Sequence, residues 1–142
     1  MPRQIVRDFE RLFCEKFGVR DAIAVNSGTA ALEVALHACS VRGKAVLTTP
    51  YTFPSTVSAI IHAGGYPLFC DVHPETGLLD ANQIHRHFVR DDIEIAAILN
   101  VNLFGRVRSQ CLAILASAYG VFLIDDNAQC FRPGVTPVDN HF

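Results

Sequence analysis

Three consecutive residues, Ser27, Gly28 and Thr29, place two hydroxyls and a glycine directly before a strongly helix-forming segment. The first backbone N–H groups of a helix have no internal partner and lie at the positive end of its dipole, so such a turn can bind a phosphate. Gly28 lets the backbone approach a ligand closely, and the hydroxyls can add hydrogen bonds. The plainer interpretation is that Ser27 only caps the helix. The rest of the chain has to decide between these two interpretations.

Further side chains that can do chemistry follow later apolar runs. Asp125, Asp126 and Gln129 come directly after one such run. The aromatic ring of Phe53 follows another. An anion-binding turn, a flat apolar face and a carboxylate together suit a planar, phosphorylated aromatic cofactor with a basic ring nitrogen, because a nearby carboxylate keeps such a nitrogen protonated. Taken singly, Asp126 fits a turn residue that closes a strand, and Phe53 fits a core aromatic.

Short apolar runs alternate with helical segments along the chain, and this order predicts the elements that position these groups. Strands are expected at 22–25, 45–48, 66–70, 93–101 and 121–124. Helices are expected at 5–17, 29–38, 54–62 and 109–119, with one more that carries Ile84 and Phe88. Continuous apolar strands separated by helices indicate an α/β fold with a mostly parallel sheet and helices on both faces. In such sheets the ligand lies outside the carboxyl ends of the strands.

Composition limits the class of protein and of partner. The chain has 142 residues, 50% hydrophobic and 18% charged, which suits one domain with a buried sheet. Its net charge of −2 argues against nucleic acid or a membrane surface as partner. No apolar run reaches membrane-spanning length and no signal peptide is recognisable, so we expect a cytoplasmic protein. The cysteines and histidines lack metal-ligand spacing, and we expect no metal site.

Four segments, in this order, resemble the DegT-type family of sugar aminotransferases, which are pyridoxal-phosphate-dependent enzymes of fold type I. They are the segments 24–32 (AVNSGTAAL), 49–53 (TPYTF), 102–105 (NLFG) and 124–129 (IDDNAQ). The resemblance spans about residues 9–129, and the first and last segments together give it most of its specificity. It implies that residues 1–142 form a single partial domain similar to the cofactor-binding large domain of these enzymes, without their small C-terminal domain.

Carried over residue by residue, the resemblance implies a binding site for pyridoxal 5′-phosphate. Gly28 and Thr29 would hold the phosphate of the cofactor. Phe53 would lie against its pyridine ring. Asp126 would pair with the ring nitrogen, and Gln129 would reach the phenolic oxygen. The nucleotide-sugar substrate of the family is the second small molecule that the resemblance implies.

The chain departs from the family pattern within these segments. Asp125 stands where the family usually has Glu, and strand alternation predicts that it faces away from Asp126. Asn102 stands where the family usually has His, and Asn127 where it usually has Ala. From the sequence, these last two changes are either neutral or a sign of relaxed constraint.

Transamination needs a Schiff-base lysine, and no lysine of this chain matches that of the family. The lysines present are Lys16, in the first predicted helix, and Lys44, expected at the opposite edge of the sheet from the cofactor site. We therefore expect a chain that resembles an aminotransferase acting on keto groups of nucleotide sugars, with an amino acid as amino donor, but that is inactive alone. No catalytic residue is assigned.

Three interpretations remain open from the sequence. The chain is part of a truncated or split aminotransferase whose lysine comes from a complementing C-terminal half. Alternatively, it is a non-catalytic domain that binds the cofactor or a nucleotide-sugar-like anion. The third interpretation, a generic nucleotide-binding α/β domain, lacks the G-x-G-x-x-G motif after the first strand. Because a partial sheet leaves an apolar edge, we expect a homo-oligomer or association with the complementing half.

Overall fold

A four-stranded parallel sheet forms the centre of the computed structural model, which describes residues 2–90 and 92–130. The strand order is β2-β1-β3-β4, and each neighbouring pair is parallel. The strands are β1 (Ala45–Thr48), β2 (Tyr66–Phe69), β3 (Ile95–Val101) and β4 (Phe122–Asp126). The parallel sheet predicted from the short apolar runs is confirmed. The last part of the domain expected over residues 1–142 lies outside the described residues.

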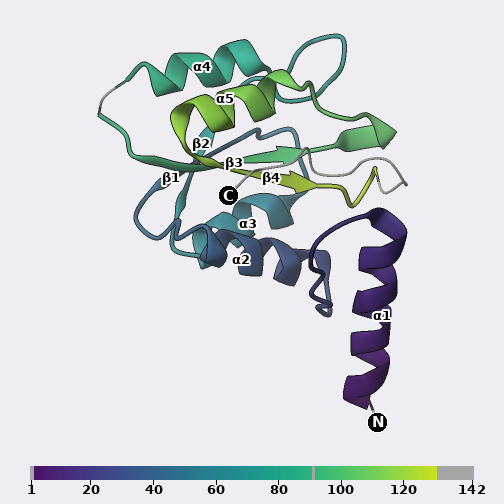
Figure 1. The fold of residues 1–142 in the computed structure, drawn as a ribbon. Helices are drawn as coiled ribbons and strands as arrows, with labels where there is room; N and C mark the ends of the chain where they lie inside the picture. The colour runs from purple at the N-terminus through teal and green to yellow at the C-terminus, as the bar shows by residue number, and fades with distance from the viewer. Residues whose placement is uncertain (1, 91, 131–142) are drawn as a thin grey trace.

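Helices cover both faces of this sheet (Figure 1). Two helices, α2 (Gly28–Ala38) and α3 (Pro54–His62), lie on one face. Two others, α4 (Ala81–Phe88) and α5 (Cys111–Tyr119), lie on the opposite face. The first helix, α1 (Pro2–Phe17), extends away from this body. In the described part of the chain, none of these helices is long and apolar enough to cross a membrane.

The sheet separates two apolar clusters, because successive side chains of a strand point to opposite faces. Toward α2 and α3, the cluster includes the fully buried Leu36 and Leu99. Toward α4 and α5, it includes the fully buried Ile84 and Ile98. Burying each such side chain contributes about 1.5–3 kcal/mol to folding. The two clusters therefore fix which face of the sheet each strand residue occupies.

The strand expected at 22–25 does not form. Ile23 is 75% exposed and Val25 is 40% exposed. A strand exists only when its backbone groups pair with a neighbouring strand, and none of β1 to β4 pairs with this segment. The N–H of Ala24 instead donates to Oε1 of Glu10 in α1, at 2.8 Å. The turn at Ser27 therefore follows an irregular segment.

Candidate functional site

The first turn of α2 combines a helix cap with two free donors. Oγ of Ser27 accepts from the N–H of Ala30 at 3.1 Å, and its carbonyl accepts from Ala31 at 3.0 Å. The N–H groups of Gly28 and Thr29 have no hydrogen-bond partner among the described residues. A Cβ placed on Gly28 would meet nothing within 4 Å. The capping and anion-binding interpretations are therefore compatible, because the cap leaves the N–H groups of Gly28 and Thr29 free.

Asp126 lies on the same face of the sheet as α2. In β4, Ile124 packs toward α2 and α3, whereas Leu123 packs toward α4 and α5. Alternation then places Asp126 on the first face and Asp125 on the second, as predicted. In Figure 1, α2 begins at the end of the sheet to which the arrowheads of β3 and β4 point. Asp126 and the free donors of α2 therefore share both a face and an edge.

Exposed aromatic rings lie at the same carboxyl edge. Phe53 is at the N-cap position of α3, just after β1, and is 69% exposed, so it is not a core aromatic. The rings of Tyr51 and Phe104 contact each other, with centroids 6.3 Å apart. One strand, β3, separates β1 from β4. The strand before Phe53, β1, and the strand that ends at Asp126, β4, are therefore about 10 Å apart. That spacing can accommodate a planar ring.

Gln129 is held by the turn that follows β3. This turn, η1 (Leu103–Gly105), contains Phe104 with a φ of 56°, a left-handed conformation that costs a non-glycine residue about 1–2 kcal/mol. The N–H of Phe104 donates to Oε1 of Gln129 at 3.3 Å. The N–H of Gly105 donates to the Gln129 carbonyl at 3.1 Å. The turn therefore engages one lone pair of the Gln129 amide oxygen.

A polar network lies on the other face of β3 and β4. Nε of Arg108 donates to both carboxylate oxygens of Asp125, at 2.8 and 2.9 Å, and the two side chains are 7% and 18% exposed. Nδ2 of Asn100 donates to Asp125 at 2.9 Å and to Asn102 at 3.0 Å. Nδ2 of Asn102 donates to Asn127 at 2.6 Å. Sequence reasoning missed this network, and its one signal was a polar Asn100 inside an apolar strand.

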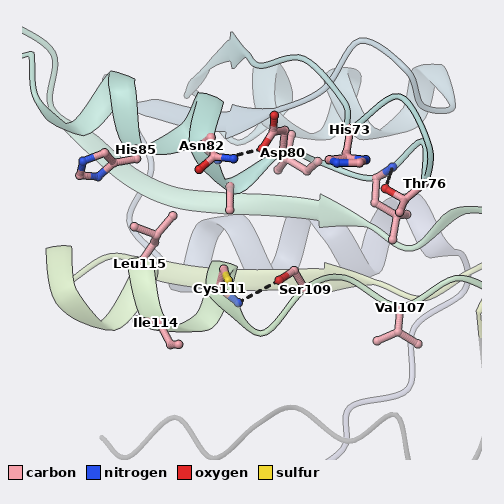
Figure 2. A pocket seen from close by; sticks show the side chains of 13 residues that line it. His73, Thr76, Asp80, Asn82, His85, Val107, Ser109, Cys111, Ile114 and Leu115 are labelled. Atoms are coloured by element: carbon pink, nitrogen blue, oxygen red, sulfur yellow. Dashed lines mark hydrogen bonds between the residues drawn. The ribbon is translucent and has the colours of Figure 1, made fainter.

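A cavity of about 550 Å³ lies in the α4 and α5 layer (Figure 2). Asp80 and Asn82 lie on one side of it, and Ser109 and Cys111 lie on the other. Asp80 caps α4 by accepting from the N–H of Asn82 at 2.9 Å. Oγ of Ser109 similarly accepts from the N–H of Cys111 at 3.2 Å. None of the residues expected to hold the cofactor lines this cavity, so it is separate from the candidate site.

Comparisons with known proteins agree on one family. The model of the DegT/DnrJ/EryC1/StrS aminotransferase family matches residues 3–135. The UDP-4-amino-4,6-dideoxy-N-acetyl-beta-L-altrosamine transaminase of Campylobacter jejuni is 37% identical over 122 residues, which cover 85% of this chain and 32% of that protein. The chain spans about a third of the length of the curated relatives that it matches.

Solved structures give the same result for the fold. The aminotransferase from Psychrobacter cryohalolentis matches with a TM-score of 0.82 and 34% identity, over 90% of this chain and 32% of that one. The ntda protein from Bacillus subtilis, solved with bound cofactor PMP, matches with a TM-score of 0.81 and 28% identity, over 87% of this chain and 28% of that one. The parallel sheet and its helices are therefore those of part of an aminotransferase.

Proposed function

The chain belongs to the DegT/DnrJ/EryC1/StrS aminotransferase family, whose members depend on pyridoxal phosphate, and we propose that it forms the part of a sugar aminotransferase that holds this cofactor. One observation gives the main support. The free N–H groups of α2 and the carboxylate of Asp126 lie on one face of the sheet, at its carboxyl edge. These are the two contacts that select a phosphate and a protonated ring nitrogen.

The residues of the α2 turn fit a phosphate group. The N–H groups of Gly28 and Thr29 are free to donate, and the open space at Gly28 lets an anion approach them. The hydroxyl of Thr29 adds a third donor, and the positive end of the helix dipole favours the negative charge. In this proposal the turn anchors the cofactor and sets the position of its ring.

The residues at the ends of β1, β3 and β4 fit the ring. When bound, pyridoxal phosphate supplies an aromatic system that accepts electrons from the substrate carbon. Asp126 keeps the ring nitrogen protonated, because a negative charge beside it stabilises the protonated form. Phe53 packs against one face of the ring. Gln129 donates its NH2 group to the phenolic oxygen, while the N–H of Phe104 holds the other end of the amide.

Neither of the two lysines of the chain matches the Schiff-base lysine of the family, and each has a neighbour in the structure that is not a residue of this site. Nζ of Lys44 pairs with Oε1 of Glu94 at 2.8 Å, just before β1 and so at the amino edge of the sheet. Lys16 lies in α1, with Nζ 5.9 Å from the ring centroid of Phe17. We therefore expect the 142-residue chain by itself to bind the cofactor without a covalent bond and not to transaminate. A nucleotide-sugar keto group is the substrate class proposed for the whole enzyme.

Binding of pyridoxamine phosphate tests the proposal, because this form of the cofactor has no aldehyde and cannot react with surface lysines. Saturable binding to the wild-type chain, followed by fluorescence, is expected. Gly28→Val should abolish it, because the side chain fills the open space in front of the free donors without a clash inside the protein. Asp126→Asn should weaken it about tenfold, the usual effect of losing a charged hydrogen bond.

A matched control separates these effects from general changes of charge. Asp21→Asn removes a carboxylate whose side chain is 82% exposed and pairs with Arg20, and which is not one of the proposed site residues. It should leave the affinity unchanged. The site assignment is wrong if Gly28→Val and Asp126→Asn bind pyridoxamine phosphate as tightly as Asp21→Asn does.

A further inference from the structure

Asn102 uses all of its side-chain polar atoms at the end of β3. It is 1% exposed. Its Oδ1 accepts from Nδ2 of Asn100 at 3.0 Å and from the N–H of Arg108 at 2.8 Å. An amide oxygen has two lone pairs, and both are engaged here. The amide therefore has one orientation, and its NH2 group faces the turn that follows β4.

That turn is held directly after the proposed ring-nitrogen carboxylate. The N–H of Asn102 donates to the carbonyl of Asp126 at 3.0 Å. The NH2 group of Asn102 donates to Oδ1 of Asn127 at 2.6 Å. Within the turn, Oδ1 of Asp126 accepts from the N–H of Ala128 at 3.0 Å. The carbonyl of Asp126 and the side chain of the next residue are thus both held by a single buried residue.

We propose that Asn102 and Asn127 act as a coupled positioning pair for Asp126. The proposal rests on the proposed function, because that function assigns Asp126 to the ring nitrogen. The pair occupies the two positions at which this chain has asparagine where the family pattern usually has His and Ala. With alanine at position 127, the NH2 group of Asn102 would be buried without an acceptor, which is unfavourable. The two departures therefore form one unit and are not independent signs of relaxed constraint.

The ion pair on the far face anchors this unit to the sheet. Arg108 donates its backbone N–H to Asn102 and its Nε to Asp125. Asp125 is paired across the sheet with Asn100, which also donates to Asn102. Because hydrogen-bonded groups in such a network restrain one another, a change at Asn102 is transmitted to Asn127 and to the turn.

Thermal unfolding of four chains tests the coupling without any ligand. The variants are Asn127→Ala, Asn102→His and the double variant, with wild type as the fourth. Asn127→Ala, which removes one hydrogen bond, should lower the midpoint by about 4 °C, and Asn102→His, which disturbs three, should lower it further. The double variant should lose clearly less than the sum of the two. Asn82→Ala, on the exposed surface of α4, is the control and should leave the midpoint unchanged.

Affinity for pyridoxamine phosphate tests whether the pair positions Asp126. It is measured at a temperature well below the unfolding midpoint of every variant. Asn127→Ala should weaken binding about fivefold in the wild-type background and have no further effect in the Asp126→Asn background. Equal weakening in both backgrounds would mean that the pair supports the fold but does not position Asp126. If the midpoint shifts of the two single variants add up in the double variant, the two asparagines are not coupled. Absence of saturable binding by the wild-type chain would overturn the proposed function and this role, whereas the midpoints would still decide whether the asparagines are coupled.

Discussion

The ion pair between Arg108 and Asp125 gives the largest stability effect that we predict. Arg108→Met keeps much of the apolar side chain and removes the guanidinium. The carboxylate of Asp125, 18% exposed, then retains one side-chain donor, Nδ2 of Asn100. Breaking one partner of a buried ion pair costs about 3–5 kcal/mol. Because Asp125 keeps that donor and some contact with water, we expect the lower end, a loss of about 3 kcal/mol in the free energy of unfolding.

A second substitution identifies the cause of this loss. Asp125→Asn in the same chain removes the uncompensated charge, and the asparagine oxygen still accepts from Asn100. The double variant Arg108→Met/Asp125→Asn should therefore be only about 1 kcal/mol less stable than wild type. The assay is urea unfolding followed by far-ultraviolet circular dichroism, with free energies extrapolated to zero denaturant.

An exposed ion pair in the same chain supplies the control. Arg11 and Glu15 are 2.7 Å apart in α1, with side chains 58% and 59% exposed. Arg11→Met should cost less than about 0.5 kcal/mol, because exposed pairs contribute little. The reasoning is refuted if Arg108→Met costs no more than Arg11→Met. It is equally refuted if the double variant is less stable than Arg108→Met alone.

Two other predictions concern the backbone and the thiols. Phe104→Gly should raise the thermal midpoint by up to about 4 °C, because glycine adopts a φ of 56° without strain. A fall of several degrees would show that the ring contact with Tyr51 stabilises the fold by more than the strain costs. Burial, and secondly the charge of Asp71, raise the pKa of Cys70 to about 12, so only about one thiol in ten thousand is ionised at pH 8. Iodoacetamide should therefore modify the exposed Cys111 and spare Cys70. Mass spectrometry that found both thiols modified at equal rates in the folded chain would contradict this expectation.

The sheet shows what sequence alone could predict of the fold. The bounds of β1, 45–48, followed from a run that is apolar at successive positions and therefore buried on both faces. The segment 22–25 has a similar composition but lies exposed without a partner strand. Composition indicates whether a segment can be buried, whereas a strand also requires a neighbour to pair with. That second condition is not encoded in the segment itself.

Part of the candidate site could also be predicted from the sequence. The placing of Phe53 and Asp126 at the carboxyl edge followed from the rule that ligands lie outside the carboxyl ends of parallel strands, whereas the strand expected before Gly28 does not form and its proposed role comes from the family resemblance. The contact between Asn102 and Asn127 was not predictable, because it depends on the register of β3 and β4 over 25 residues of separation. The left-handed turn at Phe104 was also missed, because a phenylalanine gives no local signal for positive φ.

The last two residues of β4 limit how the length of this strand can change during evolution. Asp125 faces Arg108, and Asp126 faces α2 on the opposite side. Because side chains alternate with a period of two, inserting or deleting one residue within 121–124 would exchange the faces of these carboxylates relative to the apolar part of the strand. One change would then turn Asp125 away from the face of Arg108 and Asp126 away from the face of α2. Length variants that keep both carboxylates on their present faces should therefore differ by two residues.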